Sequence, residues 1–370
     1  MSDTANHTVN HTADTVADHA ADSANDVEEL VNRLFADKVG HNSVLEAESS
    51  PLSRELWDTV AGLGLPGIGI DEAAGGSGGS LADVVTLLTA AGRHAVPLPL
   101  LEHHLALWLV TASGGQVEGS APWTVAPPPV SLTVEGTTVT GTLRDMAWGG
   151  AAERVVALAG TGPEAKVLVL DATDAEVTAG RDLAGQPRDV LTFDGATAEV
   201  LPSTVTTQQL AQHGAVLRAA QMAGAMSAVH ELTQRYTAER EQFGRPIGTF
   251  QSVRTHLVFL AQTAVMTQVS VDRAAAALAS GRDASFAAYA AKLLADQNAA
   301  VSVKSGHQAH GAIGMTREYA LQDYTRRLNA WRGDWGTEQA LADRIGAAVV
   351  GAQGIATIAT DEGVLSVCVK

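Results

Sequence analysis

The sequence predicts an α+β protein in which a helical region, a small β-rich region and a bundle of long helices follow one another. Three observations carry this prediction: apolar residues at helical spacing in the first third, short β-rich runs bounded by turn residues in the middle, and long alanine-rich stretches at the end. The chain has 370 residues, more than one hydrophobic core usually serves, so we expect two or three domains.

The first third divides into a polar tail and a helical domain. Residues 1–26 are rich in Ala, Asp, Thr, Asn and His and nearly lack large apolar side chains, so we predict a disordered tail that cannot offset the entropy lost on ordering. From 27 to 121, apolar residues recur at helical spacing, as at Leu81 and Leu88, and predict an N-terminal helical domain. The glycine-rich run 75–80 must be a loop between its helices.

The middle region, residues 122–203, opens with a proline-rich linker over 122–129. Five short β-rich runs follow: 130–134, 139–143, 154–158, 166–170 and 190–193. Turn residues such as Glu135-Gly136 and Asp194-Gly195 bound these runs. The pattern predicts a small antiparallel sheet or barrel.

The last region, residues 204–370, contains four long helical segments and predicts a four-helix bundle. The helices are expected over about 208–239, 251–279, 285–309 and 338–357. Gly281 and Gly311 suit helix ends, because glycine readily adopts the left-handed conformation that closes a helix.

Composition excludes several classes of function. A net charge of -17 argues against a nucleic-acid surface, which needs clustered Lys and Arg. The single cysteine, Cys368, allows neither a disulfide framework nor a thiolate metal cage, and we expect no metal site. The apolar stretch 98–113 is too short and too polar to span a membrane. With no basic and apolar leader pattern at the start, we expect a cytoplasmic protein.

An arginine-rich segment separates the first two long helices of the bundle. Arg240 offers a forked, permanently charged donor for a phosphate, and Phe243 offers an aromatic face or edge for a planar cofactor. The residues alone leave a second interpretation open, because an arginine-rich helix end is commonly an ordinary surface ion-pair site.

The order and spacing of two blocks resemble the flavin-binding half of the acyl-CoA dehydrogenase family. The first block is Arg240-Glu241-Gln242-Phe243-Gly244 with Gln251 after it, and the second is Gln308-Ala309-His310-Gly311-Ala312. The resemblance spans about residues 28–360 and implies the fold of that family. It implies that FAD is bound, across a subunit interface, by residues of both blocks and of a later turn: Arg240, Gln242, Phe243, Gln251, Gln308, Gly311, Ala312, Thr337 and Gln339.

The sequence departs from the family at the catalytic base. The family removes the substrate α-proton with a glutamate, and the matching position here is Trp335, whose indole cannot accept that proton. Some members carry the glutamate on the first bundle helix, where the match is Gly214. The nearest carboxylates, Asp334 and Glu338, are weak candidates for a relocated base, and the alternative is that both are structural.

Three functional hypotheses follow. The first is an FAD-dependent acyl-CoA dehydrogenase subunit that shares FAD with a base-bearing homologous chain, as in the actinobacterial heterotetramers it resembles. The resemblance implies acyl-CoA substrates of fatty-acid or sterol side-chain β-oxidation and a separate electron-transfer acceptor. The second is a non-catalytic structural subunit, and the third is a self-sufficient homotetramer that uses Asp334 or Glu338 as its base.

Overall fold

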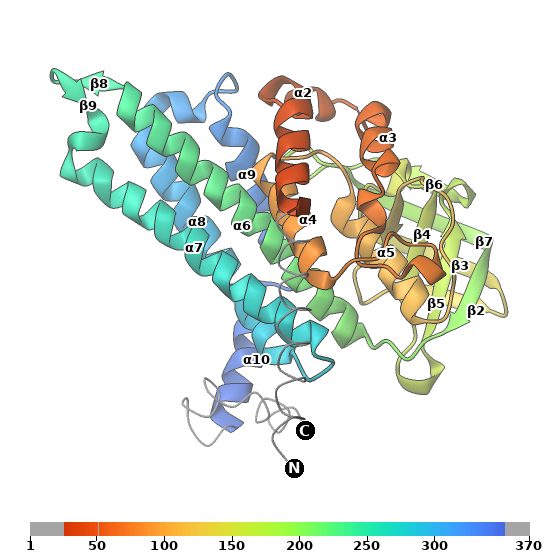
Figure 1. Cartoon of the computed structure of the whole chain (residues 1–370). Helices are drawn as coiled ribbons and strands as arrows, with labels where there is room; N and C mark the ends of the chain where they lie inside the picture. The colour runs from red at the N-terminus through yellow and green to blue at the C-terminus, as the bar shows by residue number, and fades with distance from the viewer. Residues whose placement is uncertain (1–25, 51, 352–370) are drawn as a thin grey trace, which may run out of the picture.

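The computed structural model describes residues 26–50 and 52–351. The predicted tail over 1–26, apart from its last residue, lies outside the described residues, as do the end of the last predicted helix and Cys368. Figure 1 shows a β-sheet region on one side of the molecule, long helices on the other, and the N-terminal helices between them.

The N-terminal region consists of five helices and two short 3-10 turns among the described residues. They are a helix over 26–38, α2 (His41–Ala47), α3 (Arg54–Gly62), η1 (Leu65–Gly67), η2 (Glu72–Ala74), α4 (Leu81–Arg93) and α5 (Leu100–Ala112). The α4 helix begins at Ser80, whose side chain and that of Asp83 satisfy each other's backbone N–H groups. The α5 helix is apolar on most sides and almost wholly buried, which places it at the centre of the fold.

The middle region forms one seven-stranded sheet in the order β1-β4-β5-β7-β3-β2, with β6 also paired to β7. Its strands are β1 (Trp123–Val125), β2 (Leu132–Glu135), β3 (Thr138–Ala147), β4 (Arg154–Ala159), β5 (Lys166–Asp171), β6 (Ala175–Thr178) and β7 (Arg188–Pro202). Only the β1–β4 pair is parallel. The long β7 strand connects the two halves of the sheet by pairing with β5 near one end and with β3 and β6 near the other.

Three features of this sheet correct the expectations from sequence. The β1 strand lies inside the segment expected to be a linker, where Trp123 and Val125 are buried, and β6 is a second strand that was not predicted. The Asp194-Gly195 pair does not end a strand. Gly195 adopts φ +73° where the β3–β7 register shifts, so these residues form a bulge within β7.

The C-terminal region contains three long helices and two shorter ones. They are α6 (Thr207–Glu239), α7 (Gln251–Ala279), α8 (Ser285–His310), α9 (Leu321–Trp331) and α10 (Glu338–Gly351). A two-stranded hairpin of β8 (Glu241–Gln242) and β9 (Arg245–Pro246), followed by the 3-10 turn η6 (Ile247–Thr249), joins α6 to α7. A longer 3-10 turn, η7 (Gly311–Met315), follows α8. The unpredicted α9 packs on α6 and α8, so the bundle has a fifth helix among the described residues.

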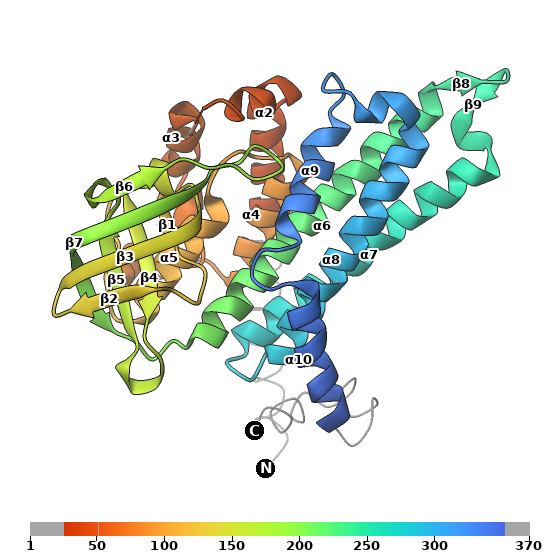
Figure 2. The same cartoon turned by 180° about the vertical axis from the view of Figure 1, so that it is seen from behind.

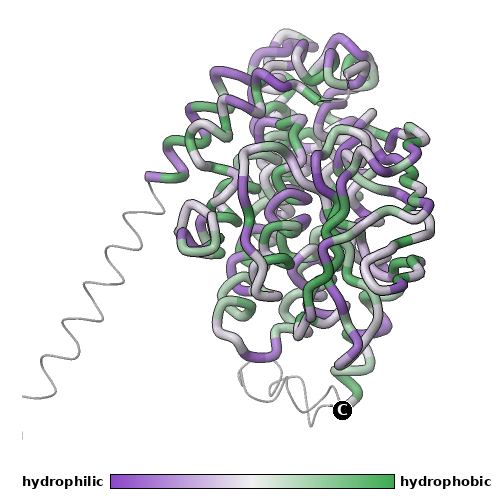
Figure 3. The backbone as a smooth tube through the Cα atoms, turned by 90° about the vertical axis from the view of Figure 1, so that its right-hand side faces the viewer, coloured by the Kyte–Doolittle hydropathy of each residue, from purple (hydrophilic) through white to green (hydrophobic). Residues whose placement is uncertain are grey.

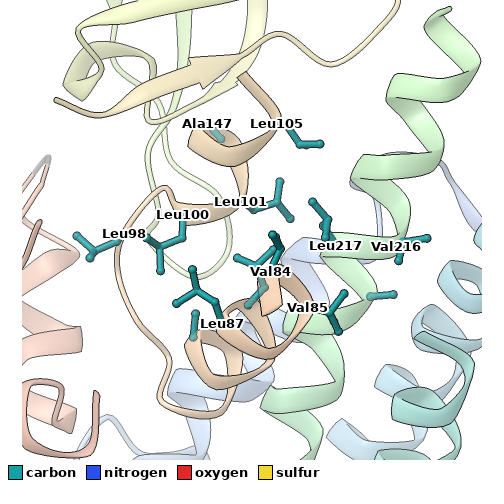
Figure 4. Packing of buried hydrophobic residues seen from close by; sticks show 14 of the residues in the cluster. Val84, Val85, Leu87, Leu98, Leu100, Leu101, Leu105, Ala147, Val216 and Leu217 are labelled. Atoms are coloured by element: carbon teal, nitrogen blue, oxygen red, sulfur yellow. The ribbon is translucent and has the colours of Figure 1, made fainter. Parts of the chain in front are cut away.

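The core is continuous between the N-terminal region and the bundle. Side chains of Val84 on α4, Leu101 on α5 and Leu217 on α6 lie together in this core (Figure 4). A second, smaller cluster fills the sheet. Hydrophilic and hydrophobic stretches alternate along most of the chain, as amphipathic elements require (Figure 3).

Candidate functional site

The hairpin between α6 and α7 projects from one end of the bundle (Figure 1). At its tip Phe243 has φ +54° and is 92% exposed, while Gly244 also has a positive φ. Arg240 ends α6, and its carbonyl accepts a hydrogen bond of 2.8 Å from the backbone N–H of Ile247. Within the chain its ring meets only the edge of Phe250, with centroids 6.0 Å apart, among the aromatic contacts of the described residues. A large, mostly exposed aromatic residue in a left-handed conformation costs stability, which favours a binding role.

The second block lies at the same end of the bundle. Tyr236, four residues before Arg240, stacks on His310 with ring centroids 4.5 Å apart and donates a 3.3 Å hydrogen bond to its carbonyl. Gly311 then ends α8 with φ +65°, and a side chain there would meet nothing within 4 Å. The structure therefore places the seven predicted residues of the two blocks at one end of the bundle, all of them exposed: Arg240, Gln242, Phe243, Gln251, Gln308, Gly311 and Ala312.

The turn between α9 and α10 lies toward the opposite end of the bundle (Figure 2). Here the Trp335 indole lies directly against Gly214 of α6. A Cβ atom added to Gly214 would come within 2.1 Å of Cδ2 of that indole, so no side chain fits between them. The two positions at which the resembled family carries its glutamate thus meet in space, and an indole and a bare backbone occupy them.

Asp334 is held in a buried ion network. Its Oδ2 lies 2.6 Å from Nη2 of Arg188 and 3.0 Å from Nε of Arg218. Arg218, with only 4% of its side chain exposed, also donates a 2.7 Å hydrogen bond to Glu102 of α5. Burial alone would lower the pKa of the Arg188 guanidinium, but the charge of Asp334 and the hydrogen bond to it raise that pKa above its ordinary value.

These contacts argue against both candidate bases. Asp334 faces two permanently charged guanidinium groups, so taking up a proton would break two ion pairs. The Glu338 carboxylate is bound by the Arg332 guanidinium and does not line the neighbouring cavity. Two predicted cofactor-binding residues follow in the same turn and helix. Gln339 is exposed and donates a hydrogen bond to Asp343, whereas Thr337 borders the cavity.

The cavity beside this turn has a volume of about 320 Å³. Its charged lining residues are three arginines and three carboxylates: Arg188, Arg218, Arg344, Glu102, Asp145 and Asp334. Lys292 and Asp296 form a buried ion pair close to this turn, with Nζ and Oδ1 2.5 Å apart. Lys292 also donates a 3.4 Å hydrogen bond to the backbone carbonyl of Arg332. Burial lowers the pKa of Lys292 and raises that of Asp296 to about 7.

Sequence reasoning missed Glu102, Arg188 and Arg218. A signal existed for two of them, because Glu102 and Arg218 each interrupt an apolar helix at positions that the helical period buries. Charged residues on such a face are expected to pair with one another. Arg188, at the start of β7, carries no comparable signal.

Residues 26–50 and 52–351 contain neither a cluster of metal ligands nor a membrane-spanning helix. In these ranges, no three His, Cys, Asp or Glu side chains are grouped so that they could hold a metal ion. No helix there has the length and apolar character that crossing a membrane requires.

Two family profiles match the chain. The acyl-CoA dehydrogenase N-terminal domain matches residues 21–116, and the acyl-CoA dehydrogenase C-terminal domain matches residues 204–350. The chain therefore belongs to the acyl-CoA dehydrogenase family of oxidoreductases, as its two sequence blocks predict. The three-part fold expected from the resemblance is confirmed.

Curated relatives and solved structures agree with this assignment. Acyl-CoA dehydrogenase IpdE2 of Mycolicibacterium smegmatis is 29% identical over 82% of this chain and 91% of its own length. FadE34 of Mycobacterium tuberculosis is 31% identical over 76% of this chain but only 40% of its own length. A variant of the Tcur3481-Tcur3483 steroid ACAD superposes with a TM-score of 0.81 at 27% identity, covering 88% of this chain and 97% of that one. The ChsE4-ChsE5 complex from Mycobacterium tuberculosis, at 23% identity, shares the fold.

Proposed function

We propose that this chain is a base-lacking subunit of an FAD-dependent acyl-CoA dehydrogenase and shares its FAD with a base-bearing homologous chain. The contact between Trp335 and Gly214 carries this proposal. It leaves no carboxylate at either family base position and no room to add one at Gly214. A second chain must then supply the group that removes the substrate α-proton.

The exposed end of the bundle supports a role in holding FAD. Arg240 ends α6 at the base of the projecting hairpin, Phe243 lies at the hairpin's tip, and Gln308 lies near the end of α8. Guanidinium and amide groups suit a pyrophosphate, an aromatic side chain suits a flat ring, and the open backbone at Gly311 allows close approach. Since these groups are exposed and do not line the chain's own cavity, they fit a cofactor that is seated largely in another subunit.

When bound, FAD supplies the hydride acceptor for α,β-dehydrogenation of an acyl-CoA thioester. This chain's residues would fix the cofactor in place from across the interface. A homotetramer that uses Asp334 or Glu338 has less support, because both carboxylates are engaged in ion pairs.

The relatives support a partner and a substrate class. One solved structure with 27% identity is named as a two-component steroid ACAD, which favours a heteromeric assembly and a sterol-derived acyl-CoA over a simple fatty acyl-CoA. We also propose a separate electron-transfer acceptor. A cytoplasmic location fits a chain whose one cysteine provides no disulfide framework.

The test replaces Arg240 by alanine in the co-expressed complex and measures bound flavin by its visible absorption. Loss of a charge-assisted contact to the pyrophosphate should weaken flavin binding at least about tenfold. Arg33→Ala is the matched control, because Arg33 is an exposed arginine on the N-terminal helix over 26–38. If Arg240→Ala and Arg33→Ala retain the same flavin, the chain is a structural subunit that does not touch FAD.

A further inference from the structure

His41, the first residue of α2, joins the N-terminal region to the bundle. Its Nδ1 lies 2.7 Å from Oδ2 of Asp323 on α9, and its Nε2 lies 2.9 Å from the backbone carbonyl oxygen of Arg317. The contact is well packed, since the side chains of His41 and Asp323 are 21% and 4% exposed. One imidazole therefore bridges two separate parts of the C-terminal region.

Both neighbours of this ring are hydrogen-bond acceptors. A neutral imidazole has a single N–H, so it can donate to only one of them. Both contacts form when the ring carries two protons, or when the proton is shared with the Asp323 carboxylate. In either form the pair holds one proton more than a neutral imidazole beside a carboxylate.

The surrounding charges favour that extra proton. Burial opposes the charge on His41, but the hydrogen bond and charge of Asp323, the Arg317 carbonyl and the charge of Glu48 together raise its pKa above the ordinary value. Glu48 also pairs with Arg317 at 3.1 Å and with Arg326 at 2.5 Å. The remaining charged group near Asp323 is the buried Arg327 on the same helix, which donates to the Asp323 carbonyl at 2.8 Å.

The bridged segment follows the second cofactor block directly. Residues 311–315 form η7, Arg317 comes two residues later, and Tyr319 then packs against His310 at 5.0 Å and against Tyr236 at 5.8 Å. An anchor at Arg317 therefore fixes a short stretch whose other end carries Gly311 and Ala312. Because this stretch is short, fixing Arg317 restricts the positions that the second block can adopt.

We propose that His41 is a positioning residue that, while protonated, holds residues 311–319 in the conformation that presents the second block, and that loosens this segment when it loses its proton. The consequence for cofactor binding rests on the function proposed above. The positioning itself does not, because every contact that makes it lies within this chain.

The direction of the pH effect follows from the raised pKa. A group that binds its proton more tightly in the folded chain contributes stability that is complete below the pKa of the unfolded chain. That contribution is lost as the pH rises through the higher pKa of the folded chain. The segment should therefore be firmest in mild acid and looser above neutrality.

Hydrogen–deuterium exchange of the full-length chain between pH 6 and 8.5, corrected for intrinsic exchange, tests the positioning. We expect protection of the peptide covering 311–319 to fall roughly fivefold across this range, while a peptide from the middle of α8 keeps a flat profile. His41→Gln, which can donate but does not titrate, should give low and pH-independent protection. His94→Gln is the matched control, because His94 contacts Asn32 at 3.1 Å and lies away from the segment.

The proposal would be overturned if protection of 311–319 in the wild-type chain did not change with pH. It would also be overturned if His41→Gln showed the same pH dependence of protection as the wild-type chain. If His41→Gln fails to fold, Asp323→Asn removes the carboxylate whose hydrogen bond and negative charge raise the pKa of His41, and should likewise flatten the profile. Flavin release from the co-expressed complex, measured over the same pH range, tests the functional link separately. Loosening without faster flavin release would contradict the cofactor role and leave the positioning of the segment intact.

Discussion

Trp335 and Gly214 define the site at the scale of single residues. The absence of a side chain at Gly214 is what allows the indole to lie against α6. The indole in turn stands at the position where the resemblance to the family places a catalytic glutamate. Because the two residues are in contact, the effect of a substitution at one on stability should depend on which residue occupies the other position.

Gly214→Ala should therefore destabilise the chain by about 1–3 kcal/mol or more, because its Cβ would overlap the Trp335 ring. Urea denaturation measures the loss. In a Trp335→Ala background the same change should cost much less, since the obstructing ring is gone. Gly346→Ala on α10 is the control, because a Cβ there meets nothing within 4 Å and helix propensity makes the change neutral or favourable. Equal costs of Gly214→Ala in both backgrounds would show that the ring does not fill this space.

At the scale of elements, the contact between α4 and α6 fixes how the N-terminal region meets the bundle. Two glycines make this contact close: a Cβ on Gly92 would lie 1.9 Å from the carbonyl oxygen of Gln221, and one on Gly224 would lie 1.8 Å from that of Thr89. The obstacles are backbone atoms, so rotation of a side chain cannot relieve the overlap. The two helices can then accept a larger residue only by moving apart.

Gly224→Ala should consequently lower the free energy of unfolding by about 3 kcal/mol and lower the midpoint of urea denaturation. Gly62→Ala, near the end of α3, is the matched control because a Cβ there meets nothing within 4 Å. If Gly224→Ala is as stable as that control, the close helix contact does not exist in solution.

Sequence patterns predict elements well where periodicity is long and fail where it is short. The segments expected over 208–239 and 251–279 correspond to α6 and α7 within one residue, because long alanine-rich runs bounded by turn residues leave few alternatives. The four-residue strand β6 and the three-residue strand β1 carry too little pattern to recognise. The 11-residue α9 does carry apolar side chains at helical spacing, at Leu321, Tyr324, Leu328 and Trp331, so its sequence contains a helical signal.

Some residues of the candidate site could be predicted from the sequence, and others could not. Arg240 and Gln308 belong to blocks that are contiguous in the sequence, so they could be found there before the structure was known. The pairing of Arg188 with Asp334 joins residues 146 positions apart. Such a contact depends on the packing of the sheet region against the bundle, which local patterns do not describe.

At the scale of the whole molecule, the features that concern FAD and the catalytic base lie apart. The hairpin and the end of α8 lie at one end of the bundle, whereas the turn between α9 and α10 lies toward the other (Figure 2). That turn carries Trp335, which packs against Gly214. On the function proposed above, this chain contacts FAD from outside the main cofactor site and takes its catalytic base from a second chain. We therefore expect this chain to depend on a base-bearing partner for activity.

The most direct test is acyl-CoA-dependent reduction of bound flavin, measured with this chain alone and with the same chain co-expressed with a base-bearing homologue. Both samples receive excess FAD and a sterol-derived acyl-CoA. The account predicts no reduction by the chain alone, and rapid bleaching of the flavin absorbance by the complex, with a flavin content near one per pair of unlike chains. Flavin bound near one per chain and reduced by substrate in the chain alone would contradict it.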